Sequence, residues 1–228
     1  MRLPHIKASL GALLELAWYA VCAVEADPDV NGLQKQIADA RLSLRKARDA
    51  RNDASDDLVK ARALRGIALM AVGKWLRQLN LDTTAAFGGK KKSLDFLRIF
   101  PLSPSKMMAQ ASADRVISVQ NVLKALAHPA TPKSLAPHAK SGEALLKAFT
   151  TREAGVVAAQ AVVKDRIDDI RVIRKTWFTA YRSLESALAL KFPDDAERVN
   201  AYFDEPPKAK VDASLSEPVP VVVPVVNP

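Results

Sequence analysis

Cysteine, glycine and aromatic residues are scarce in this 228-residue chain, and each shortage excludes a class of protein. The single cysteine, Cys22, excludes an internal disulfide framework and a thiolate metal cluster. Because its neighbours are apolar, we expect a buried structural thiol. Only eight glycines and 6% aromatic residues argue against tight hairpins and a β-sheet core. The apolar residues are mainly alanine and leucine, which predicts closely packed helices.

Long apolar runs are also missing, and no stretch reaches the ~18 residues that a membrane span needs. The nearest is residues 8–26, which follow basic residues and so resemble a secretory signal peptide. However, Glu15 interrupts this stretch, and its apolar residues recur at the spacing of an amphipathic helix. These residues are Leu10, Leu13, Leu14, Ala17, Trp18 and Val21. We therefore expect a structural helix over residues 7–26 and a cytoplasmic protein without a membrane span.

Two long segments carry apolar residues at steps that alternate between four and three. The first helix of this kind is expected to begin near Asp29 or Asn31, and no proline follows until Pro101. Its seam is Leu33, Ile37, Ala40, Leu44, Ala47, Arg51, Ala54, Leu58, Ala61, Arg65, Ala68, Val72, Trp75 and Leu79. The second, over residues 141–191, has the seam Leu145, Phe149, Arg152, Val156, Ala159, Val163, Arg166, Ile170, Ile173, Trp177, Ala180, Leu184 and Ala187. A 3.5-residue period predicts a left-handed coiled-coil seam.

Shorter helices complete the prediction. Ser103 followed by Pro104 is typical of a helix start, and this helix is expected to continue to about residue 127. Residues 194–203 are expected to add one short helix. The predicted fold is thus all-α: an elongated antiparallel bundle of two long coiled-coil-like helices and two shorter ones. It forms a single domain over residues 1–203, with hairpin-like halves 1–80 and 103–203 joined by a loop at 81–102.

Four arginines interrupt the two seams, namely Arg51, Arg65, Arg152 and Arg166. Each is costly to bury alone, so one interpretation pairs it with a carboxylate across the helices or leaves its charged end in water. The other interpretation is that the seam turns toward solvent at these positions. The sequence favours neither.

Residues capable of catalysis are few and scattered. His5, His128 and His138 have no histidine partner one helical turn away, so no metal motif is present. The adjacent pairs Asp56-Asp57 and Asp168-Asp169 point about 100° apart on a helix and lie beside lysines or arginines, which favours surface ion pairs. The sequence therefore predicts no enzyme, no metal, no cofactor and no small-molecule substrate.

Charge is distributed unevenly along the chain. Residues 29–192 contain 29 basic and 15 acidic residues, whereas residues 193–228 contain three basic and seven acidic ones. Such a basic segment can attract a polyanion through backbone phosphates. The candidate polyanion-binding residues are Lys35, Arg41, Arg45, Lys46, Arg48, Lys90, Lys91 and Lys92. The alternative is an ordinary solvated helix surface that carries both signs.

The C-terminal residues 204–228 form a Pro/Val-rich tail. Valine favours extended structure while proline prevents a central strand, so we expect an extended segment that docks on its own chain or on a neighbouring subunit. The candidate partner-binding residues are Val219, Val221, Val222, Val223, Val225 and Val226.

Taken together, these features favour a non-enzymatic structural or scaffolding protein. We expect it to form a homo-oligomer through its long helices and its tail. The alternative function is sequence-independent binding of nucleic acid by the basic helical surface.

Overall fold

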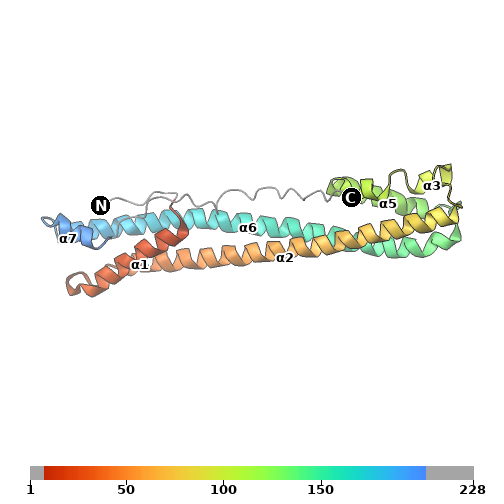
Figure 1. Cartoon of the computed structure of the whole chain (residues 1–228). Coiled ribbons are helices and arrows are strands. Elements are labelled where there is room, and N and C mark those ends of the chain that lie inside the picture. Colours follow the sequence, from red (N-terminus) through yellow and green to blue (C-terminus); the bar gives the residue numbers. More distant parts are fainter. Residues whose placement is uncertain (1–7, 204–228) are drawn as a thin grey trace. The chain divides into compact units, whose positions relative to one another are not determined.

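The computed structural model describes residues 8–203, and every regular element in this part of the chain is a helix (Figure 1). The α-helices are α1 (Leu10–Ala26), α2 (Lys35–Ala86), α3 (Leu94–Ile99), α4 (Pro104–Ala109), α5 (Ser112–Leu126), α6 (Ala136–Lys191) and α7 (Ala196–Ala201). Two short 3-10 helices, η1 (Pro28–Val30) and η2 (Lys133–Leu135), lie between them. The all-α class and the two long helices, which pack together, are confirmed. The described residues contain no strand.

The chain forms two compact units, each with its own hydrophobic core. Of the described residues, unit 1 comprises 8–54 and 162–203, and unit 2 comprises 55–161. Helices α2 and α6 contribute to both units, and in each they run side by side in opposite directions (Figure 1). The single domain expected over residues 1–203 stays a prediction.

In unit 1, side chains of α1, α2, α6 and α7 form one hydrophobic core. The α1 helix starts at Ser9, whose Oγ accepts a hydrogen bond from the backbone N–H of Ala12 at 3.1 Å. The predicted apolar positions of α1 are buried except Trp18, which is 50% exposed. The prediction of a buried Cys22 is wrong, since the thiol is exposed. Its position lies about 100° round the helix from the buried Val21 and therefore outside the buried stripe.

Two glycines end α2 and begin the connection to α3. Gly88 and Gly89 have φ angles of 58° and 80°, in the left-handed region that other residues avoid. The N–H of Gly89 donates to the carbonyl of Thr84 at 2.8 Å, a bond that caps the free carbonyls of the last turn. The segment 81–102, expected to be a loop, thus contains the end of α2 and all of α3 (Leu94–Ile99).

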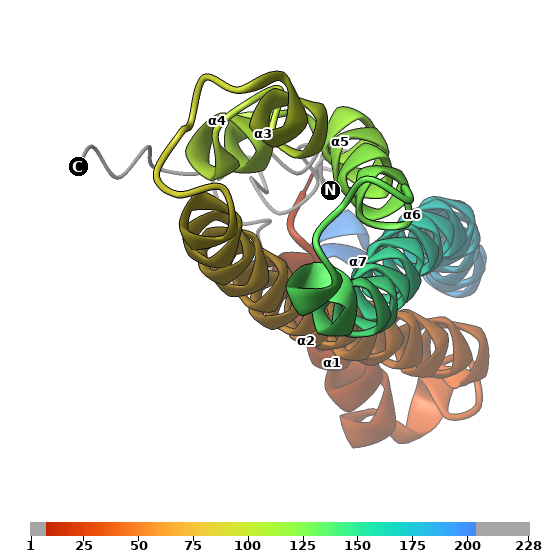
Figure 2. The same cartoon turned by 90° about the vertical axis from the view of Figure 1, so that its right-hand side faces the viewer.

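In unit 2, the helix expected over residues 103–127 is divided into α4 and α5, which lie with α3 on one side of the unit (Figure 2). Ser103 caps α4 as predicted, with Pro104 at its first position. The guanidinium of Arg115 donates to the carbonyls of Met108 and Gln110 at 3.2 and 2.6 Å. These bonds satisfy backbone acceptors that a continuous helix would satisfy within itself, so the break costs little.

Helix α6 begins five residues earlier than predicted, at Ala136. Pro137 occupies its second position, where a missing N–H costs no hydrogen bond. One turn later, Gly142 lies against α2 and α5. A Cβ at Gly142 would lie 2.3 Å from Cζ2 of Trp75 and 2.8 Å from Cδ2 of Leu123. Only glycine allows the three helices to approach this closely.

The two seams are largely buried, as the 3.5-residue spacing predicts. Fully buried seam residues are Ile37, Leu44, Val72, Leu79, Phe149, Ile170 and Trp177. Among the seam arginines, Arg65 pairs with Glu153 across the two long helices at 3.5 Å, whereas Arg152 and Arg166 are exposed. Both interpretations therefore hold, each for different arginines. The supercoiled geometry itself stays a prediction.

Candidate functional site

The predicted polyanion-binding residues of α2 do not form one stripe. They are Lys35, Arg41, Arg45, Lys46 and Arg48, all in unit 1. At 100° per residue, Arg41, Arg45 and Arg48 lie within about 60° of one another, but Lys46 lies about 140° from Arg41. The helix therefore spreads its positive charge around its circumference.

Two of these arginines also contact other side chains. The guanidinium of Arg41 lies 4.3 Å from the ring centroid of Trp18 in α1, a cation–π contact that ties α1 to α2. The guanidinium of Arg48 forms an ion pair with Asp49 at 3.0 Å. Both guanidinium groups therefore already contact side chains of the same chain, and an external anion would compete with these contacts.

Lys90, Lys91 and Lys92 lie in the connection between α2 and α3 and are all exposed. This connection belongs to unit 2, whereas the α2 cations listed above belong to unit 1. The eight candidate residues therefore fall into two groups. Within unit 2, the three consecutive lysines form the most concentrated group of positive charge among the candidates.

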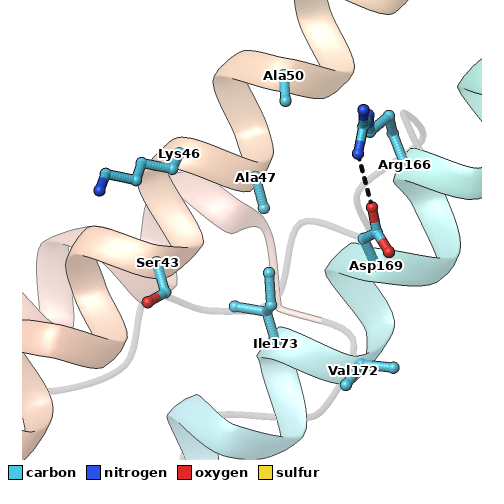
Figure 3. Close-up of a pocket in the computed structure, with 8 residues that line it drawn as sticks. All are labelled: Ser43, Lys46, Ala47, Ala50, Arg166, Asp169, Val172 and Ile173. Carbon is cyan, nitrogen blue, oxygen red and sulfur yellow. Dashed lines mark hydrogen bonds and ion pairs between the residues drawn. The ribbon is translucent and has the colours of Figure 1, made fainter.

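A pocket of about 470 Å³ lies between α2 and α6 within unit 1 (Figure 3). Its lining is Ser43, Lys46, Ala47, Ala50, Arg166, Asp169, Val172 and Ile173. Ile173 points toward Ala47 across the pocket, and Arg166 Nη1 lies 3.1 Å from Asp169 Oδ2 on the same helix. Of the candidate residues predicted from the sequence, only Lys46 lines this pocket. Alanine side chains on α2 are too short to fill the space beside α6, which leaves the pocket.

The pocket has little capacity for chemistry. Val172 and Ile173 form an apolar wall on the α6 side, and the positive charge of Arg166 is balanced by Asp169. The pocket's lining contains one hydroxyl, that of Ser43, and no histidine that would activate it as a nucleophile. The pocket suits an apolar side chain of another segment better than a reacting substrate.

A histidine–carboxylate pair that sequence reasoning missed lies in unit 2. His138 Nε2, in the first turn of α6, lies 2.8 Å from Asp82 Oδ2 at the end of α2. The backbone carbonyl of His138 accepts a hydrogen bond from Trp75 Nε1 at 3.2 Å, and Gln78 donates to Asp82 Oδ1. The hydroxyl of Ser141 donates to backbone carbonyls of α6. The pair joins the ends of two helices and lacks an activated nucleophile.

A second polar network in unit 1 was also missed. Asp27, after α1, accepts hydrogen bonds from the hydroxyl of Tyr202 and from Arg198 at 2.7 Å. The Tyr202 bond and then the Arg198 bond lower the pKa of Asp27 to about 2. Arg198 also donates to Asp29 at 2.9 Å and lies 4.0 Å from the ring of Phe192. This network fixes α7 against the connection between α1 and α2.

Burial and charge also shift the pKa of Tyr202, in the second network, and of Arg115, outside both networks. Removal from water raises the pKa of Tyr202, with a further contribution from its bond to Asp27. In unit 2, burial lowers the pKa of Arg115, while the nearby Glu153 opposes this effect. Burial and neighbouring side chains account for both pKa shifts, so neither shift by itself marks a catalytic group.

No described group of three or more His, Cys, Asp or Glu side chains is arranged to hold a metal ion. None of the described helices combines the length and hydropathy of a membrane span. No protein-family model, curated protein or solved structure matches this chain.

Exposed apolar side chains on the long helices remain as candidate contact surfaces. In unit 2, Val59, Ile67 and Met70 of α2 are 60–67% exposed, and Val157 of α6 is 61% exposed. In unit 1, Val172 of α6 is 64% exposed. The candidate partner-binding residues of the C-terminal tail, from Val219 to Val226, lie outside the described residues 8–203.

Proposed function

We propose that this protein is a non-enzymatic structural protein that self-associates through its long helices and its C-terminal tail. The observation that supports it is a group of large apolar side chains on α2 in unit 2 that remain more than half exposed and lie within three turns of one another, Val59, Ile67 and Met70. A helix with apolar residues on both its inner and outer sides gains stability when a partner covers the outer side.

The test is the mass of the full chain in solution over a range of concentrations, measured by light scattering. We expect the mean mass to rise above 24.8 kDa as the concentration increases. Deleting residues 216–228 is expected to lower the oligomeric state while the far-UV circular dichroism of the helices stays unchanged. A full chain that remains monomeric at all concentrations would contradict self-association. An oligomer unchanged by the deletion would remove the tail from the proposal.

The second candidate function is sequence-independent binding of nucleic acid. It is favoured by the exposed lysines 90–92, which lie together in one connection of unit 2. Replacing all three by glutamine should weaken binding to double-stranded DNA and reduce its salt dependence, because each phosphate contact releases counterions. The control variant replaces Lys133 and Lys140, which are distant in sequence. If the full chain binds no DNA or RNA at about 50 mM salt, this candidate is excluded.

A further inference from the structure

We infer that the outer side of α2 in unit 2 is the surface on which a second copy of this chain docks, with the two α2 helices antiparallel. This inference rests on the self-association proposed above and names the surface responsible. We call the surface the outer stripe. It consists of Val59, Ala63, Gly66 and Met70, with Ile67 beside them.

The outer stripe is a second seam on the same helix. Its four main residues follow one another at steps of four, three and four, so they share one side of α2. The large buried side chains of α2 in unit 2, including Leu58 and Val72, point to the other side, and Gly73, one turn after Met70, lies against Met108 of α4. Val59 and Met70 are 63% and 67% exposed, and a Cβ at Gly66 would meet no atom within 4 Å.

The order of large and small residues along the stripe is self-complementary in one orientation. If the twofold axis passes midway between Ala63 and Gly66, Val59 of one copy faces Met70 of the other. Ala63 then faces Gly66 at the centre. Small residues at the crossing point let two helix backbones approach closely, and the larger side chains fill the space on either side. A two-fold interface of this kind uses the same patch on both copies.

Charges at the two ends of the stripe favour the same orientation. Asp56 lies one turn before Val59, and Lys74 lies one turn after Met70; both are exposed. Antiparallel packing brings Asp56 of each copy near Lys74 of the other. Parallel packing in register would place Asp56 beside Asp56 and Lys74 beside Lys74, and this repulsion disfavours it.

The size of the stripe determines the expected strength. From Val59 to Met70 the helix rises by about 17 Å. A contact of this length on one helix buries less than the roughly 800 Å² per partner of a standard stable interface. We therefore expect a dimer that forms at micromolar concentrations and dissociates on dilution.

The first experiment measures the dimer dissociation constant of the full chain by analytical ultracentrifugation. Met70→Glu is expected to raise this constant at least tenfold, because it places two carboxylates in the apolar contact. Ala63→Glu, at an exposed position that leaves the core intact, is expected to act in the same direction. The matched control is Ile117→Glu on α5, which is 54% exposed in the same unit and outside the stripe. It is expected to leave the constant unchanged.

A charge exchange tests the orientation. Asp56→Lys and Lys74→Asp should each raise the dissociation constant about three- to tenfold at low salt, and the double variant should restore it. In a Cys22→Ser background, a chain with Val59→Cys mixed with one carrying Met70→Cys should form the mixed disulfide faster than either forms its own.

The outcomes separate the two proposals. A wild-type chain that is monomeric at every concentration overturns the outer-stripe dimer together with self-association. A wild-type oligomer whose mass is unaffected by Met70→Glu and Ala63→Glu overturns the outer stripe alone. If deletion of residues 216–228 then dissociates that oligomer, the tail provides the contact instead. Failure of the charge exchange and of the mixed disulfide overturns the antiparallel arrangement.

Discussion

Replacing Gly142 by alanine is the sharpest test of how unit 2 is packed. In an open helix this change stabilises a protein by roughly 1 kcal/mol, because alanine is the better helix former. At Gly142, however, the added Cβ would lie 2.3 Å from Cζ2 of Trp75. That ring cannot simply move away, since it is 7% exposed and its Nε1 donates to the carbonyl of His138.

Overpacking of this kind costs typically 1–3 kcal/mol, and the propensity gain of up to about 1 kcal/mol offsets only part of it. We therefore expect Gly142→Ala to lower the free energy of unfolding by about 1–2 kcal/mol. The matched control is Gly155→Ala on the same helix, where a Cβ would meet no atom within 4 Å. This control should be more stable than the wild type by about 0.5–1 kcal/mol.

The assay is urea unfolding followed by far-UV circular dichroism, together with the fluorescence of the tryptophans. A double-mutant cycle with Trp75→Leu isolates the contribution of the ring, because it removes the closer clash and leaves the one with Leu123. In the Trp75→Leu background, Gly142→Ala should cost about 1 kcal/mol less than in the wild type, or cost nothing. The reasoning is refuted if Gly142→Ala is as stable as Gly155→Ala.

Three further predictions concern the core and the polar networks. Ile170→Asp should destabilise by about 4 kcal/mol or more in urea unfolding, because it places an unpaired carboxylate at a fully buried position; Val172→Asp, at an exposed position, should change stability by less than about 0.5 kcal/mol. The pKa of Asp27, about 2 in the folded protein against an ordinary 3.8, means that its contribution is present above about pH 4 and is lost as the pH falls toward 2. Asp27→Asn should therefore lower the urea midpoint at neutral pH, and its difference from the wild type should shrink below pH 4. Glu153→Gln should destabilise by about 1 kcal/mol, because it leaves two neighbouring arginines without their carboxylate, whereas Asp168→Asn, in an exposed pair, should have little effect. Equal effects of these last two variants would contradict the role of the partly buried pair.

Helix starts and buried helix sides were predicted correctly where they depend on residues within a few turns of one another. The cap at Ser103 with Pro104 behind it starts α4 as expected, since the cap depends only on residues within one turn. The seam spacing predicted that Ile37, Leu44 and Ile170 are buried, because a helix with one apolar side must cover it. The outer stripe of α2 has the same spacing over only four positions and was not predicted from it.

Prediction failed where the cap or the contact comes from a residue more than one helical turn away along the chain. The break between α4 and α5 depends on Arg115, which reaches back to carbonyls of the preceding helix. The α3 helix forms within an expected loop because Phe96 and Ile99 find a core to fill. Neither residue carries a local signal strong enough to show this.

The sequence by itself determined the all-α class, the two long helices and the side of each that is buried, because the period of apolar residues and the helix caps act over a few neighbouring positions. Only the tertiary structure decided which polar groups meet. His138 reaches Asp82 across 56 residues, and Arg198 reaches Asp27 across 171. It also decided that Gly142 must lack a side chain and that the outer stripe stays uncovered within unit 2. These features depend on the distance between surfaces that are far apart along the chain, which helical periodicity does not encode.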